Sequence, residues 1–206
     1  MKFLLICFIV AFCTVFLTAQ SDVRLSAMLS NGIYRLAADD IDTDFDYGLV
    51  MGLDIYVYGN ERLIEPLGRI GFTRQKTSNK FNRFELTTTQ LNVCGGVKVE
   101  PGSKQFSLML YAGLAPYLSK KVQSADARKS SDVAAYFNTF DRFLGMQLNT
   151  RLLSFSRSGS LFENIDFTIS YEHGITNLIN RYAIHLSSRG DWIRSRSIKA
   201  GLLFAF

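Results

Sequence analysis

Cysteine and histidine are scarce in this chain of 206 residues, and their scarcity excludes two classes of protein. Of three cysteines, Cys7 and Cys13 lie in an N-terminal apolar stretch, so Cys94 has no partner with which to build a disulfide scaffold. We interpret Cys94 as a small packed side chain rather than a reactive thiol. Two histidines and this cysteine supply no metal-ligand cluster at usable spacing, and we expect no metal site and no cofactor.

Long apolar runs and a strong charge of one sign are also missing beyond the N-terminus. After residue 19 no apolar run approaches the roughly 18 residues that a spanning helix needs, which excludes a helical integral membrane protein. Without Lys2 the chain has 22 basic and 18 acidic residues, which gives a formal net charge of +4. This excess is small and scattered, so we expect no nucleic acid as a partner.

The first 19 residues have the features of a secretory signal peptide. Lys2 precedes an apolar run over residues 3–17, whose 15 residues fit a signal core of about 7 to 15. Cleavage after Ala19 removes 19 of the 206 residues and leaves 187. We therefore predict export and a single domain over residues 20–206.

The remaining sequence alternates apolar and polar side chains with a period of two, which is typical of β-strands. In 83–99 the apolar positions change from even to odd, which predicts a β-bulge in that strand. Only residues 132–136 are compatible with a short helix. The eight predicted strands cover residues 23–36, 47–58, 63–74, 83–99, 106–118, 139–153, 165–175 and 197–206.

The connections between these strands alternate in length. Tight turns at 59–60, 101–103 and 157–159 alternate with longer polar loops at 37–43, 75–82, 119–138 and 176–192. Short turns at one end and long loops at the other are typical of outer-membrane β-barrels, whose turns face the periplasm. We predict an all-β fold, an eight-stranded antiparallel transmembrane β-barrel with up-and-down strand order, in the bacterial outer membrane.

The polar face of the strands indicates which way the apolar face points. It contains glycine and small polar residues, whereas a water-exposed exterior would usually carry many Lys and Glu. Charges on this face would each cost up to about 2 to 4 kcal/mol against lipid, so we expect them to point inward and pair. The predicted interior charge network comprises Asp54, Lys98, Arg151, Asp166, Glu172 and Lys199. A soluble carrier barrel, with its apolar face inward, is the alternative.

Two further groups of residues are candidate sites. The terminal strand ends in Phe204 and Phe206, which resemble the carboxy-terminal signal that bacterial outer-membrane proteins present to their insertion machinery. The third long loop is basic, and phosphates of lipopolysaccharide are suitable ligands for such residues, although loop solubility explains them about as well. These basic residues are Lys120, Lys121, Arg128 and Lys129.

Three segments of the chain carry a resemblance to a known family: YGLVMGL at 47–53, LYAGLAPYL at 110–118 and YEHGITNL at 171–178. With these segments the chain resembles the PorT-like outer-membrane β-barrel proteins of Bacteroidetes. The resemblance extends over essentially the whole mature chain, but 86–91 departs from the Ile-Pro-Leu type of segment usual in the family. It implies an eight-stranded outer-membrane barrel and, through the family's namesake, a link to protein secretion.

We therefore expect a membrane-anchored scaffold with extracellular binding loops and no enzymatic activity. Its expected partners are outer-membrane lipids including lipopolysaccharide, the barrel insertion machinery and an envelope or secretion-system protein. Because side chains fill so narrow a barrel, a general porin is not expected. A barrel that binds or moves a specific ligand is one alternative. A barrel enzyme is another, and it would need His173 or His185 in one cleft with a carboxylate and a nucleophile.

Overall fold

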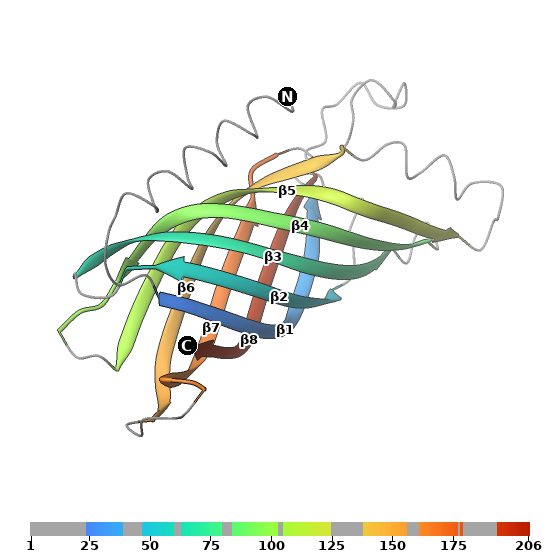
Figure 1. Cartoon of the computed structure of the whole chain (residues 1–206). Coiled ribbons are helices and arrows are strands. Elements are labelled where there is room, and N and C mark those ends of the chain that lie inside the picture. Colours follow the sequence, from blue (N-terminus) through green and yellow to red (C-terminus); the bar gives the residue numbers. More distant parts are fainter. Residues whose placement is uncertain are drawn as a thin grey trace.

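A computed structural model shows a closed antiparallel β-barrel in which the strands follow chain order (Figure 1). The eight strands are β1 (Arg24–Ala38), β2 (Gly48–Tyr58), β3 (Ile64–Asn79), β4 (Phe84–Val99), β5 (Phe106–Ser124), β6 (Phe140–Ser154), β7 (Asn164–Gly174) and β8 (Ile193–Ala205). The structure describes residues 24–38, 47–59, 63–79, 84–102, 105–124, 138–155, 161–176, 178 and 193–206. The predicted signal peptide at 1–19 and the short helix at 132–136 lie outside these ranges.

The predicted fold class is confirmed, since each predicted strand has a counterpart in the barrel. The barrel closes where β8 pairs with β1, for example Leu202 with Leu29. The backbone N–H of Phe206 donates to the carbonyl oxygen of Leu25 at 3.0 Å, so the last residue lies beside the start of β1. No helix among the described residues is long and apolar enough to cross a membrane.

Three predicted strand bounds were wrong because β3, β5 and β8 extend into polar sequence. β3 continues to Asn79 and β5 to Ser124, whereas the prediction ended them at 74 and 118, and β8 begins at Ile193 rather than at 197. The polar end of β3 pairs with the polar start of β4, as in Lys76 with Thr87. Backbone pairing thus holds these strand ends together where side-chain alternation gives no signal. Only residues 80–83 separate β3 from β4, so the loop predicted at 75–82 is much shorter.

The β-bulge predicted in 83–99 lies on the neighbouring strand instead. Thr89 pairs with Ser119 and Gln90 with Tyr117, so the extra residue, Leu118, belongs to β5. Even-numbered residues of β4 point inward on both sides of this step. The apolar positions change from even to odd because Leu86 is an apolar residue on the inward face. The strand itself keeps its even-numbered residues inward.

The outward and inward faces of the strands have opposite character. On β2 the outward Met51 is 62% exposed and Leu53 is 47% exposed, whereas the inward Val50 and Tyr56 are fully buried. The same alternation brings apolar side chains to the exterior on the other strands. The soluble carrier alternative needs an inward apolar face, so it is wrong for this chain. An exterior of this kind requires lipid around it.

Candidate functional site

Four charged side chains form the central cluster inside the barrel: Asp54 on β2, Arg69 on β3, Glu172 on β7 and Lys199 on β8. Arg69 Nε donates to Asp54 Oδ1 at 2.9 Å, and Arg69 Nη1 lies 2.7 Å from Glu172 Oε1. Lys199 Nζ lies 2.7 Å from Glu172 Oε2. Because β3 and β7 are not neighbours in the barrel, the ion pair between Arg69 and Glu172 crosses its interior.

Two tyrosine rings enclose the guanidinium group of Arg69. Its Cζ atom lies 4.9 Å from the ring centroid of Tyr111 and 5.8 Å from that of Tyr56, within the range of cation–π contacts. Tyr111 Oη donates to Glu172 Oε1 at 3.2 Å, and Tyr56 Oη donates to Gln147 Oε1 at 2.9 Å. A buried charge is tolerated when opposite charges and hydrogen bonds compensate it, and this cluster contains two charges of each sign.

Two glycines leave the space that the cluster occupies. A Cβ atom on Gly71 would overlap the carboxylate of Asp54, and one on Gly145 would overlap the ring of Tyr111. Glycine is therefore required at these two inward positions for steric reasons. Its lack of a side chain leaves room in the narrow barrel for the Tyr111 ring and for the ion pair of Asp54 with Arg69.

A second charged group lies at the end of the barrel that contains the start of β1. Lys98 Nζ lies 3.5 Å from Glu65 Oε2 and 2.5 Å from Glu100 Oε1. The same ammonium group lies 4.1 Å from the ring centroid of Tyr58. In outer-membrane barrels the end with the short turns faces the periplasm, and the start of β1, the end of β8 and the short connections between β2 and β3 and between β4 and β5 lie at this end, so it is called the periplasmic end.

The periplasmic group continues around the mouth of the barrel. Arg151 Nε lies 3.7 Å from Asp166 Oδ1, and Arg24 Nη2 lies 3.5 Å from Glu163 Oε2. A polar pocket of about 330 Å³ opens here, and its lining includes Arg24, Arg151 and Glu163. These pairs are partly exposed, so water screens them more than it screens the central cluster.

The structure thus divides the predicted interior network into two groups. Asp54, Glu172 and Lys199 belong to the central cluster, whereas Lys98, Arg151 and Asp166 belong to the periplasmic group. The sequence analysis missed Arg69, which joins Asp54 to Glu172. A signal was present, since Arg69 shares its strand phase with Gly71 and alternates with the outward Ile70.

Among the described residues, the extracellular end of the interior contains apolar side chains, buried threonine and glutamine side chains, and the carboxyl group of Asp141. Leu36, Leu86 and Leu178 are each at most 3% exposed. The backbone N–H of Asn138 donates to the carbonyl oxygen of Leu178 at 2.7 Å, which ties the segment before β6 to the segment after β7. Ser195, the register partner of Leu36, donates through its Oγ to the carboxylate of Asp141.

The predicted basic loop is only partly described. Lys120 and Lys121 lie within β5, not in a loop, because that strand continues to Ser124. Lys120 Nζ donates to the carbonyl oxygen of Asn138 at 2.5 Å, whereas Lys121 is exposed. Arg128 and Lys129 lie outside the described residues.

The terminal aromatic residues pack against the turn that precedes β7. The ring of Phe162 lies 5.4 Å from that of Phe204 and 5.2 Å from that of Phe206. This places both residues of the predicted insertion signal in one aromatic cluster at the periplasmic end. Their recognition by the insertion machinery stays a prediction.

His173 lies on the outward face of β7, where its Nδ1 atom is 3.4 Å from Tyr171 Oη. Glu172, the adjacent carboxylate, points to the opposite side of the sheet into the central cluster. His185 lies outside the described residues. Within the described strands and turns, no three His, Cys, Asp or Glu side chains gather as a metal site would require.

Comparison with solved structures supports the same architecture. The chain is similar to the attachment invasion locus protein Ail of Yersinia pestis, solved with the heparin analogue sucrose octasulfate, at 13% identity and a TM-score of 0.52, covering 90% of this chain and 100% of Ail. This is the fold of a small outer-membrane β-barrel. The neisserial surface protein NspA matches with 11% identity and a TM-score of 0.49, over 90% of this chain and 100% of NspA. No family model and no curated protein matches the chain.

The apolar exterior and this fold together give the location of the barrel. A closed sheet with outward leucine, isoleucine, methionine and phenylalanine satisfies its own backbone groups and presents apolar surface to lipid. The protein is therefore a β-barrel of the bacterial outer membrane, with the central cluster within the membrane-spanning part.

Proposed function

We propose that the protein is a membrane-anchored scaffold that acts through its outer and loop surfaces rather than as a pore. The observation that carries this proposal is the ion pair between Arg69 and Glu172, which crosses the interior with Tyr56 and Tyr111 beside it. Ions passing through the barrel would have to displace paired charges held in a narrow space.

Conductance of the refolded mature chain in a planar lipid bilayer tests this proposal. We expect no stable conductance steps from the wild-type barrel. Glu172→Ala removes the carboxylate that holds both Arg69 and Lys199, and we expect it to introduce steps. Lys76→Ala, which changes an outward side chain, is the matched control and should stay silent. Stable steps from the folded wild-type protein would contradict the closed interior and favour the ligand-transport alternative.

A role as an accessory to protein secretion is a finer proposal, and it rests on the resemblance of three segments to PorT-like barrels. Deleting the gene and measuring the amount of secreted protein in the culture medium tests it. We expect a fall that is restored by the wild-type chain. Unchanged secretion in the deletion strain, with an intact outer membrane, would refute the secretion role without affecting the closed-scaffold proposal.

The proposed scaffold has no enzymatic step. Support comes from the separation of the candidate groups, because His173 is outward while Glu172 and the pair of Ser195 with Asp141 are inward. Hydrolysis of a phospholipid substrate by the purified barrel, lost in His173→Ala, would overturn this part of the proposal.

A further inference from the structure

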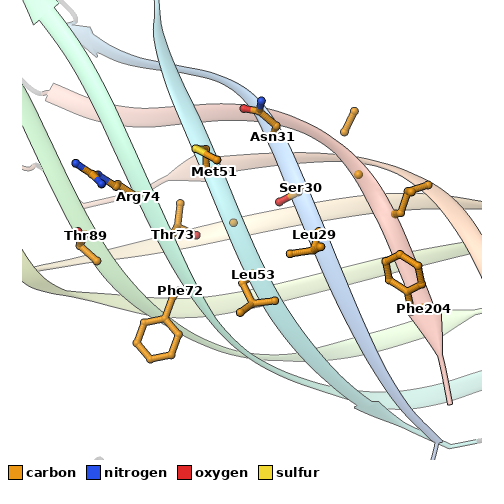
Figure 2. A pocket seen from close by; sticks show the side chains of 14 residues that line it. Leu29, Ser30, Asn31, Met51, Leu53, Phe72, Thr73, Arg74, Thr89 and Phe204 are labelled. Carbon is orange, nitrogen blue, oxygen red and sulfur yellow. The ribbon is translucent and has the colours of Figure 1, made fainter. Parts of the chain in front are cut away.

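The outer wall of the barrel is hollowed by a groove of about 600 Å³ that crosses β8, β1, β2 and β3 (Figure 2). Its floor includes the glycines Gly201 and Gly52, which both pair with Ser30 of β1. These three residues have their side-chain positions toward the interior, so backbone forms much of the floor. The groove therefore opens toward the lipid that surrounds the barrel.

One wall of the groove is apolar. Leu29, Leu53 and Phe72 are register neighbours on β1, β2 and β3, and each is about half exposed on the outward face. Together with Leu202 of β8 they form a continuous apolar row. Figure 2 shows Leu53 and Phe72 on the opposite side of the groove from Asn31 and Arg74.

The other wall contains two polar side chains that face the membrane. Asn31, Met51 and Arg74 are register neighbours on β1, β2 and β3, and all three are exposed. Asn31 Oδ1 accepts a hydrogen bond from the backbone N–H of Gly32 at 2.8 Å. No side chain or backbone group among the described residues bonds to the Asn31 Nδ2 donors or to the Arg74 guanidinium.

Donors without partners are costly beside hydrocarbon, so this wall needs acceptors from outside the chain. Arg74 lies five residues before Asn79, the extracellular end of β3. Lys76, two residues closer to that end on the same outward face, adds positive charge, though it is paired with Glu85 at 2.9 Å. The groove is thus apolar toward the membrane centre and cationic toward the extracellular surface.

We propose that this groove holds one phosphorylated lipid of the outer leaflet, of the lipid A class. A phosphate oxygen accepts hydrogen bonds from the Arg74 guanidinium, which suits phosphate geometrically, and a polar oxygen of the same lipid accepts from Asn31 Nδ2. One acyl chain lies along Leu29, Leu53 and Phe72. This site is separate from the closed interior, so its failure would leave the scaffold proposal intact.

Native mass spectrometry of the full mature barrel, refolded in neutral maltoside micelles and titrated with bisphosphorylated lipid A, tests the site. We expect one lipid A per barrel and at least tenfold weaker binding of dephosphorylated lipid A. Arg74→Gln removes the charge, and Ala200→Phe fills the groove beside Asn31, its register partner. Each should weaken lipid A binding about tenfold, which corresponds to about 1.4 kcal/mol.

Two matched variants separate a built site from general attraction. Arg142→Gln removes another exposed outward arginine, on β6, and Ala112→Phe enlarges another exposed outward alanine, on β5. Both should bind lipid A like the wild type. If Arg142→Gln weakens lipid A binding as much as Arg74→Gln does, a diffuse basic surface attracts the lipid and the proposed site is refuted. Unchanged binding in Ala200→Phe would refute a lipid chain in the groove. Heat-dependent gel mobility confirms that each variant is folded.

Discussion

Replacing Arg69 by methionine tests whether the central cluster holds the barrel together. Methionine keeps much of the side-chain volume but removes the charge between Asp54 and Glu172. Glu172 keeps Lys199 at 2.7 Å, whereas Asp54 loses its ion-pair partner while its side chain stays fully buried. Removing one partner of a buried pair costs about 3 to 5 kcal/mol, so we expect a loss of that size in the free energy of unfolding.

The assay is urea unfolding of the barrel in lipid vesicles, followed by the heat-dependent shift in gel mobility. Arg24→Met is the matched control, because its partner Glu163 is 54% exposed and the pair lies at the rim. An exposed pair contributes about 0 to 1 kcal/mol, so this control should unfold almost like the wild type.

A second variant separates lost charge pairing from lost packing. In Arg69→Met combined with Asp54→Asn, the uncompensated carboxylate is gone, and we expect at least 1 kcal/mol of the loss to return, within the range found for coupled neighbours. The reasoning fails if Arg69→Met stays within about 1 kcal/mol of the wild type, or if the double variant is no more stable than Arg69→Met.

Three further predictions concern other positions of the wall. Gly145→Ala should cost about 1 to 3 kcal/mol, because its Cβ overlaps the Tyr111 ring; the same unfolding assay checks this. Leu53→Arg should destabilise the barrel by about 2 to 4 kcal/mol in vesicles, since this half-exposed side chain faces lipid, and a neutral result would contradict the assigned exterior. Cys94 is 2% exposed, so a maleimide should label it only after unfolding; rapid labelling of the folded barrel would refute its burial.

The alternation of side chains was enough to predict the number of strands and the outward apolar face. It could not predict the register, because shifting a strand by two residues preserves the faces and changes every neighbour. The contact of Arg69 with Glu172 depends on the closure of the whole sheet, so no local sequence pattern on β3 or β7 predicts it. The inward position of Arg69 could have been predicted from the sequence, because Arg69 is two residues from Gly71 and therefore on the same face of β3.

The ends of β3 and β5 were missed for a different reason. At the end of β3 burial still alternates, but the inward Gln75 and Thr77 are as polar as the outward Lys76, so the sequence has no apolar and polar contrast there. Backbone pairing continues the sheet there, together with polar contacts such as the ion pair between Lys76 and Glu85. The groove near Arg74 was equally hidden, since it results from small residues on β1, β2 and β8 that become neighbours only through the register.

The seam between β1 and β8 has a consequence for the order of folding. Ser26 pairs with Ala205, so the barrel closes only when residues from nearly opposite ends of the sequence meet. Until then the sheet has two free edges. Contacts of such long sequence separation slow folding, because the loss of chain entropy precedes the stabilising pairing. Until the last strand is synthesised and docked, the first strand exposes unpaired backbone groups, and the chain depends on protection from aggregation during its transit to the membrane.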